Sequence, residues 1–148
     1  PVIAASGIAT GRQMLAAMAL GADGVQIGSR FAASDESSLH QNFKNRIIEL
    51  KEGDTHLALK KLVPVRMIKN KFFNQIQEAE NKGASAEELK AILGRARAKK
   101  GMFEGDLEEG ELEIGQVSAM LKEIKPVKKR VDEIILEYDN ARAKITHS

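Results

Sequence analysis

Two short apolar runs that each end in glycine have the clearest chemical meaning in this chain. Gly7 ends the first run, residues 1–8, and Gly28 lies near the end of the second, residues 24–31. Glycine lets the backbone approach a ligand closely because it has no Cβ. Several backbone N–H groups that converge from two loops can bind a phosphate dianion without a charged side chain. The pattern therefore predicts a site for the phosphate of a flavin or a nucleotide.

A single helical segment separates these runs. Thr10 and Gln13 fit a capping box at its start, and Gly21 fits the position just after its end. The order strand, loop, helix, strand, loop is that of two successive units of a parallel α/β fold. In a (β/α)8 barrel, the loops after the last two strands commonly bind phosphate. We predict the fold class as α/β: the C-terminal part of a TIM (β/α)8 barrel with its last two β-strands, followed by a mostly helical segment.

The rest of the chain shows mainly helical spacing. N-cap candidates at residues 34–37 are expected to start one helix, and a longer helical segment from about 58 to 79 is interrupted at Pro64. Within it, Arg66 and Asn70 would lie one turn apart and serve a structural role. Pro126 fits the first position of the terminal helix. The apolar stripe of that helix is expected to comprise Val127, Val131, Ile134, Ile135 and Tyr138, with Lys125, Lys128, Lys129 and Arg130 on the solvent face.

We expect three regions along the sequence. Residues 1–36 hold the last two βα units of the barrel and the phosphate-binding loops, and residues 37–114 form a helical insertion or lid with an acidic loop. Residues 115–148 are C-terminal helices that return to the barrel. The acidic loop is predicted to be solvated, and its spacing does not match a Ca²⁺-binding loop, so we predict no metal site.

Composition excludes several classes of function. The 148 residues include 23 Lys and Arg against 21 Asp and Glu, a balance that argues against a nucleic-acid-binding protein. Since the chain has no cysteine, disulfide, Cys–zinc and thiol-nucleophile chemistry are excluded. Neither a membrane-spanning run nor a signal peptide is recognisable, so the default expectation is a cytoplasmic protein without a membrane partner. Pro1 already lies in a strand pattern, and two strands cannot close a barrel, so we expect a longer polypeptide.

Four segments resemble the nitronate monooxygenase family, formerly the 2-nitropropane dioxygenases. They are P-V-I-A-A-S-G-I at 1–8, G-A-D-G-V-Q-I-G-S-R-F at 21–31, E-S-S-L-H at 36–40 and Gly115-Gln116. The FMN-type enoyl-acyl-carrier-protein reductases are related. Inosine-monophosphate dehydrogenases and other phosphate-binding barrels share a similar G-G-I…G-A-D…G-S pattern, so residues 1–30 alone leave the ligand open. Ser6 replaces a family glycine, and its added Cβ is tolerable only if the φ of Ser6 is negative. Ser29 replaces a threonine of the family pattern.

The resemblance implies that FMN is the cofactor, bound in a TIM barrel. It implies cofactor-binding roles for Gly7, Gln26, Ile27, Gly28 and Ser29. Arg30 is left open between an anion contact and a salt bridge. The family's catalytic histidine lies on a segment that this chain does not contain, so the catalytic residue is unknown. The three histidines of the chain are not substitutes for it: His40, His56 and His147.

The implied activity is an FMN-dependent monooxygenase that oxidises alkyl nitronates, a small-molecule substrate, with O₂. One alternative is the enoyl-acyl-carrier-protein reductase, which uses NAD(P)H to reduce the flavin. A second alternative is a non-catalytic helical fragment. We expect the isolated chain neither to retain FMN nor to turn over substrate, and a homo-oligomer is left open.

Overall fold

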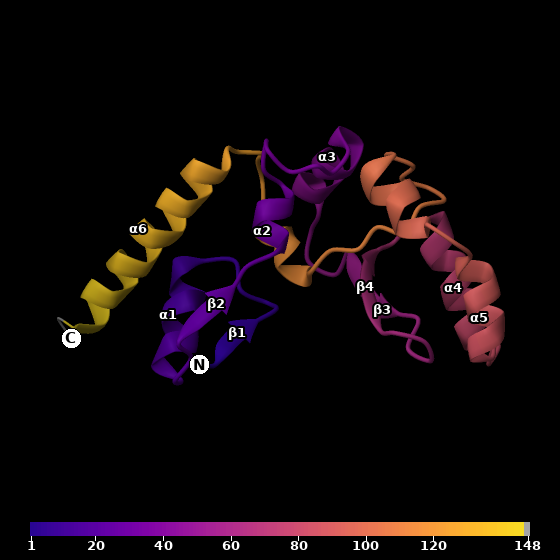
Figure 1. The fold of residues 1–148 in the computed structure, drawn as a ribbon, viewed down its shortest axis with the longest axis horizontal. Coiled ribbons are helices and arrows are strands. Elements are labelled where there is room, and N and C mark those ends of the chain that lie inside the picture. The colour runs from indigo at the N-terminus through magenta and orange to yellow at the C-terminus, as the bar shows by residue number, and fades with distance from the viewer. Residues whose placement is uncertain (147–148) are drawn as a thin grey trace. The chain divides into compact units, whose positions relative to one another are not determined.

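A computed structural model describes residues 1–146, and its backbone divides into two compact units. Unit 1 contains residues 1–37 and the described residues from 123 onward, and unit 2 contains residues 38–122 (Figure 1). His147 lies outside the described residues. The three regions expected from the sequence, with boundaries at residues 36 and 114, were defined by their functional roles. The division of the backbone into two units does not test those roles, so the three regions stay a prediction.

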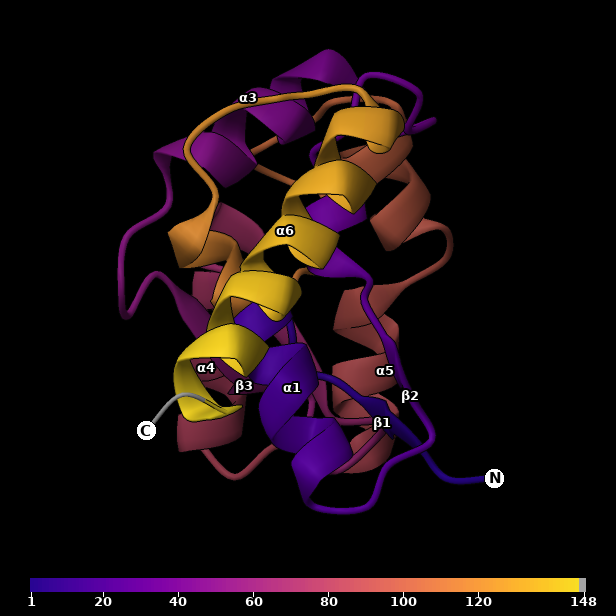
Figure 2. The ribbon, with the colours of Figure 1, turned by 90° about the vertical axis from the view of Figure 1, so that its left-hand side faces the viewer.

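Unit 1 contains a parallel strand–helix–strand motif. Its elements in chain order are β1 (Ile3–Ala5), α1 (Gly11–Ala19), β2 (Gly24–Gln26), α2 (Ser29–Ala32) and α6 (Val127–Thr146). β1 and β2 pair in parallel, with Ala4 opposite Val25. The two views show α6 running alongside α1 (Figures 1 and 2). The predicted α/β class and the order of these first elements are thereby confirmed.

The capping of α1 is as the sequence predicts. The Gln13 amide donates to Thr10 Oγ1 at 3.2 Å, and the Gln13 side-chain oxygen accepts the Thr10 amide at 3.0 Å. Gly21 follows the C-cap with φ +103°, a conformation that favours glycine. Gly11 has a further role, since a Cβ there would lie 2.2 Å from the backbone oxygen of Ile134. Only glycine at this position lets α6 approach α1 so closely.

The prediction for the faces of α6 is wrong in part. Ile134 is buried, but Val131 and Ile135 are 43% and 47% exposed. Arg130, which was expected to face solvent, is only 3% exposed. The inward face of this helix is therefore largely polar, because its charged side chains bind backbone groups of α1, α2 and the following loop. The helix begins at Val127, one residue after the predicted start at Pro126.

Unit 2 has a conventional apolar core. Its elements are α3 (Gln41–Glu49), β3 (Thr55–Ala58), β4 (Val65–Ile68), α4 (Lys71–Asn81), α5 (Ala86–Leu93), a π-helical turn η1 (Lys99–Phe103) and a 3₁₀ helix η2 (Gln116–Met120). Side chains from the hairpin and both helices form one cluster: Ala58, Leu59, Met67, Phe72, Phe73, Ile76 and Leu89. Ser85 caps α5 through a capping box with Glu88.

The predicted helical segment from 58 to 79 is wrong over its first half. β3 and β4 form an antiparallel hairpin in which Leu57 lies opposite Arg66, and Pro64 immediately precedes β4. Proline lacks the amide that a helix interior needs, and β-branched residues such as Val65 favour strands. Arg66 therefore lies on a strand, where it donates to the Thr55 carbonyl at 2.9 Å. Asn70 instead caps α4 by accepting the Phe73 amide at 2.8 Å.

Two loop predictions in unit 2 also need correction. The N-cap of α3 is His40, whose Nδ1 accepts the Asn42 amide at 3.1 Å, so the candidates at 34–37 do not cap this helix. The acidic loop is not simply solvated, because Gly110 and Glu111 are buried. Over the described part of the chain, no helix is long and apolar enough to cross a membrane.

Candidate functional site

The two glycine loops leave neighbouring strands at the same edge. Ala5 and Gln26 form the last pair of the parallel β1–β2 ladder. Gly7 and Gly28 each follow two residues later. Because the strands are parallel, their carboxyl ends lie side by side, and this is where α/β folds bind ligands. The pairing thus brings the two predicted loops to adjacent positions.

The first loop has an unusual backbone. Ser6 and Gly7 both adopt φ +71°. The sequence expectation that Ser6 requires a negative φ is wrong, since this serine occupies the left-handed region that costs a residue with a Cβ about 1 kcal/mol. Both residues are exposed. Retained strain at an exposed loop is typical of binding sites, where the conformation serves the ligand.

Several amides of these loops are unused within the protein. In the described part of the chain, the amides of Gly7, Ile8 and Gly28 donate no hydrogen bond to another protein group. The next two amides are used, since Ala9 and Thr10 both donate to the side-chain oxygen of Gln13. No atom lies within 4 Å of a Cβ built at Gly7 or Gly28. Open space and unpaired donors therefore coincide at both loops.

The remaining predicted residues lie on β2 and at the start of α2. The side chains of Val25 and Ile27 line an apolar pocket of about 170 Å³ together with Ile134 and Ile135 of α6. Side chains alternate along a strand, so Gln26 points to the opposite face of the sheet, where it is exposed. Ile27 can therefore offer only its backbone to a ligand near the strand ends. Ser29 is the first residue of α2, directly after Gly28.

Arg30 forms a buried ion network behind the loops. It is 6% exposed and donates to the Ala9 carbonyl at 2.6 Å. Its guanidinium also pairs with Glu133 at 3.0 Å and with Glu137 at 3.2 Å. Burial opposes the charge of Arg30, but the two carboxylates outweigh it and raise the pKa of this group. The sequence left two roles open for Arg30, an anion contact and a salt bridge. In the structure Arg30 forms the salt bridge.

The network extends along α6. Arg130 donates to the carbonyls of Ala33 at 2.9 Å and Glu123 at 2.5 Å. Burial and the nearby Arg30 lower the pKa of Arg130. Glu133 also binds Lys125, and this hydrogen bond, followed by the one from Arg30, lowers the pKa of Glu133. Sequence reasoning missed Glu133 and Glu137, although these two residues lie four positions apart and so share a face of α6.

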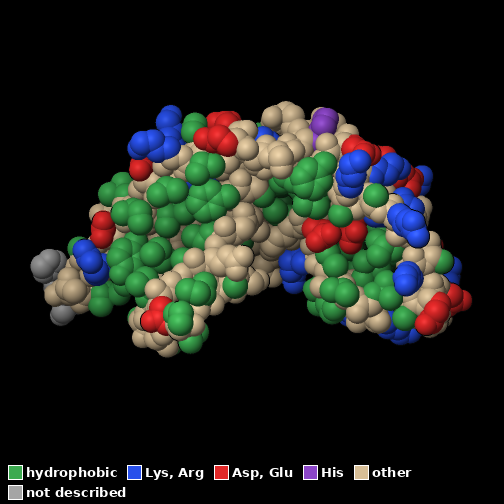
Figure 3. All heavy atoms as spheres, viewed as in Figure 1, with side chains coloured by type: hydrophobic (Ala, Val, Ile, Leu, Met, Phe, Trp, Pro, Cys, Tyr) green, Lys and Arg blue, Asp and Glu red, His purple; other side chains and the backbone are tan. Residues whose placement is uncertain are grey.

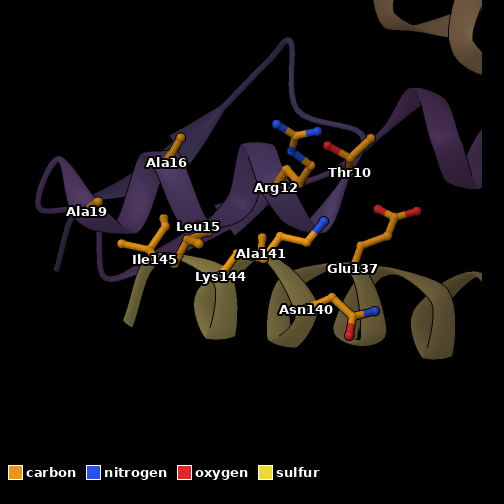
Figure 4. A pocket seen from close by; sticks show the side chains of 10 residues that line it. All are labelled: Thr10, Arg12, Leu15, Ala16, Ala19, Glu137, Asn140, Ala141, Lys144 and Ile145. Carbon is orange, nitrogen blue, oxygen red and sulfur yellow. The ribbon is translucent and has the colours of Figure 1, made fainter. Parts of the chain in front are cut away.

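A groove of about 550 Å³ runs between α1 and α6. The groove is lined mainly by apolar groups, including those of Leu15, Ala16 and Ala141, and Arg12 and Lys144 also line it (Figure 4). Glu137 points from α6 toward the N-terminal end of α1, near Thr10 (Figure 4). Figure 3 shows hydrophobic side chains gathered over the surface of this unit. Among the described residues of unit 1, the large hydrophobic side chains with the highest exposed fractions are those of Val2, Leu20, Leu136 and Ile145.

Unit 2 contains one strongly perturbed carboxyl group. Burial, and then the charge of Glu113, raises the pKa of Glu111 to about 7. The two described histidines have structural contacts: His40 caps α3, and His56 Nε2 lies 3.1 Å from the Gly53 carbonyl oxygen. Within residues 1–146, no group of three or more His, Asp or Glu side chains is arranged to hold a metal ion.

With this geometry described, comparison with known proteins identifies the family. A family model for nitronate monooxygenase matches residues 1–137. The chain belongs to the nitronate monooxygenase family. A probable nitronate monooxygenase of Bacillus subtilis (strain 168) is 33% identical over 138 residues, or 93% of this chain and 40% of that protein. One from Staphylococcus saprophyticus is 42% identical over 84 residues, or 55% of this chain and 23% of that protein.

Solved structures agree with this assignment. FabK from Thermotoga maritima superposes with a TM-score of 0.91 at 39% identity, covering 99% of this chain and 47% of that one. Nitroalkane oxidase from Streptomyces ansochromogenes superposes with a TM-score of 0.75 at 30% identity, covering 98% of this chain and 41% of that one. The chain therefore spans less than half the length of each of these relatives.

Proposed function

We propose that this chain supplies the FMN-phosphate site of an FMN-dependent oxidoreductase of the nitronate monooxygenase type. In this proposal, β1 and β2 are the last two strands of a TIM barrel, and the remaining strands come from outside the 148 residues. The observation that carries the proposal is the set of unpaired amides at two neighbouring strand ends, those of Gly7, Ile8 and Gly28. A dianion needs several convergent donors, and no protein group competes for these.

The residues of this chain would divide the binding of FMN between them. The amides of Gly7, Gly28 and Ser29 would hold the phosphate, with Ile27 contributing its backbone only. Gln26 would face the flavin from the exposed side of β2. Bound FMN supplies the redox chemistry of the enzyme. The catalytic residue of the enzyme is expected on a part of the polypeptide outside this chain.

The proposed reaction is the oxidation of an alkyl nitronate with O₂. An enoyl-thioester reductase that uses NAD(P)H is the alternative that the loop motif also permits. The match to the nitronate monooxygenase family model and to curated relatives named as probable nitronate monooxygenases supports a nitro-compound substrate. The exposed apolar residues of unit 1, such as Val2 and Leu20, agree with a surface that further parts of an enzyme cover.

The test uses the polypeptide as its gene encodes it, with any residues that precede Pro1. We expect the purified protein to carry FMN, visible in its absorption spectrum, and to consume O₂ with an alkyl nitronate but not NAD(P)H with an enoyl thioester. The wild-type protein should bind FMN at least roughly 100-fold more tightly than riboflavin, since each hydrogen bond to a charged group contributes about tenfold or more. Equal affinity for FMN and riboflavin would contradict the phosphate site, and NAD(P)H-dependent reduction would favour the alternative.

A further inference from the structure

The exits of the two glycine loops are joined by one pair of charged side chains. Arg30 lies in the first turn of α2, directly after the second loop. Its Nη1 donates a 2.6 Å hydrogen bond to the carbonyl of Ala9, which follows the first loop. The same guanidinium binds both carboxylate oxygens of Glu137, each at 3.2 Å. Glu137 Oε2 also accepts the amide of Gly11 at 2.7 Å, at the first residue of α1. Each loop is thereby connected to the other and to α6.

The charge of Arg30 is already compensated by protein groups. Two carboxylates and one carbonyl surround it, and its side chain is 8% exposed. A guanidinium in this position holds backbone groups in place and offers little free charge to a ligand. Backbone amides are then left to bind the anion, and their positions matter because the guanidinium of Arg30 is already held by protein groups.

The reach of Glu137 depends on a close helix contact. A Cβ at Gly11 would lie 2.2 Å from the Tyr138 amide nitrogen and 2.8 Å from the Glu137 carbonyl carbon. Glycine at this point brings the turn of α6 that carries Glu137 against the N-terminus of α1. Figure 4 shows the carboxylate of Glu137 directed to that end of α1. A residue more than a hundred positions away thus sets where the first loop enters its helix.

We propose that Arg30 and Glu137 are positioning residues for the phosphate of FMN. They fix the spacing of the two loops and contact no part of the cofactor. This inference rests on the proposed function, because it concerns the same phosphate site. A binding site is most effective when the surrounding contacts hold its donors in place before the ligand arrives.

The experiment measures FMN and riboflavin dissociation constants for the apo form of the full-length polypeptide. The ratio of the two constants reports the phosphate loops, since riboflavin lacks only the phosphate. We expect Glu137→Gln, which removes the charge, to weaken FMN binding by roughly tenfold while riboflavin binding changes less than about twofold. Arg30→Lys should have the same effect, because an ammonium cannot bind Ala9 and two carboxylates in the same planar geometry.

Glu133→Gln is the matched control. Glu133 pairs with the same guanidinium at 3.0 Å, but within residues 1–146 its side-chain partners are Arg30 and Lys125 and not a backbone group of either loop. We expect this variant to lower the melting temperature of the apo protein while leaving the ratio of the FMN and riboflavin constants within about twofold of the wild type. A merely structural role for the network would move both variants alike, and would affect both ligands equally.

Each outcome has a separate meaning. If the wild type prefers FMN and Glu137→Gln keeps that preference in full, the positioning role is wrong and the proposed function stands. If the wild type shows no preference for FMN over riboflavin, the proposed function itself fails. Should Glu137→Gln not fold, Glu137→Asp takes its place, since the shorter carboxylate keeps the charge but cannot reach both Gly11 and Arg30. An unchanged ratio in that variant would equally overturn the proposal.

Discussion

The two units of this chain are stabilised in different ways. Unit 2 buries a large apolar core that includes Phe43, Phe72 and Ile76. Among the described residues of unit 1, the buried side chains include two arginines, Arg30 and Arg130, whereas the buried apolar ones are small apart from Ile134. Burial of apolar area is the main source of stability in most domains. Unit 1 instead buries charged side chains that bind carboxylates and backbone carbonyls, and a buried ion pair is weak evidence for added stability.

The loops of the two units differ in how far their backbone groups are hydrogen-bonded within the protein. In the acidic loop of unit 2, Asp106 accepts the amides of Glu108 and Glu109, and the side chain of Asn70 donates to the carbonyls of Leu107 and Gly110. The glycine loops of unit 1 keep unpaired amides in open space. A glycine-rich loop therefore indicates a ligand only where its backbone donors are not already used by the protein.

The largest expected effect comes from adding a methyl group to a glycine in each kind of loop. A Cβ at Gly110 would lie 2.1 Å from the Cα of Gly101, and backbone atoms cannot move aside as side chains do. We expect Gly110→Ala to lower the free energy of unfolding by about 3–4 kcal/mol. Gly28→Ala, in open space, should change it by less than about 0.5 kcal/mol. Urea denaturation of the two variants measures both values, and a large loss in Gly28→Ala would show that the second loop is packed.

Sequence patterns predicted the first loops and their flanks well because local rules decide them. Capping by Thr10 and Gln13, the end of α1 at Gly21 and the parallel pair of strands all follow from neighbouring residues. The hairpin of unit 2 was mistaken for a helix because Leu59 and Leu62 also fit helical spacing. Only tertiary pairing between Thr55–Ala58 and Val65–Ile68 distinguishes the two.

The ion network could not be predicted from the same patterns. Arg30 and Glu137 are 107 positions apart, and no local spacing links residues at that separation. The polar inward face of α6 also contradicts the usual assumption that apolar residues face the core. Arg130 is buried there because its Nη2 donates to the carbonyls of Ala33 and Glu123. The positions of these two carbonyls depend on the tertiary structure, because the two residues lie in segments far apart in the sequence.

The next prediction compares one isoleucine in each unit. Ile76 is fully buried in the core cluster of unit 2, and we expect Ile76→Ala to cost about 3 kcal/mol of unfolding free energy. Ile134 is 5% exposed, but it borders the open pocket beside Ile27, so its surroundings can relax. Ile134→Ala should cost about 2 kcal/mol or less. Hydrogen exchange of amides in each unit separates the two losses. An equal or larger loss for Ile134→Ala would mean that unit 1 has a true apolar core.

A change of pH should move the two units in opposite directions. The pKa of Glu111 in the folded protein is raised from 4.5 to about 7, so folding favours its protonated form. The resulting stabilisation of unit 2 is present below pH 4.5 and is lost as the pH rises toward 7. In unit 1 the pKa of Glu133 is lowered, so its contribution is present above its ordinary value and is lost as the pH falls.

Glu111→Gln tests the first half of that comparison. A neutral amide removes the cost of burying a charge, so we expect this variant to gain about 2 kcal/mol of stability near pH 8 and to lose the slope seen between about pH 5 and 7. Glu113→Gln, which removes only the neighbouring charge, should give a smaller gain in the same direction. Denaturation curves over this pH range provide the measurement. A wild-type stability that rises with pH in unit 2 would contradict the assignment.

The smallest expected effect separates the outer face of α6 from its inner face. Lys128 pairs with Asp132 at 2.8 Å one turn along the helix, and their side chains are 84% and 62% exposed. Exposed pairs of this kind contribute about 0.5 kcal/mol or less and are screened by salt. We expect Lys128→Ala to stay within that limit and to become indistinguishable from the wild type at high salt. A loss of unfolding free energy well above about 0.5 kcal/mol that persists at high salt would show that the outer face of α6 also stabilises unit 1. The buried ion network would then not be the only charged contact that stabilises this unit.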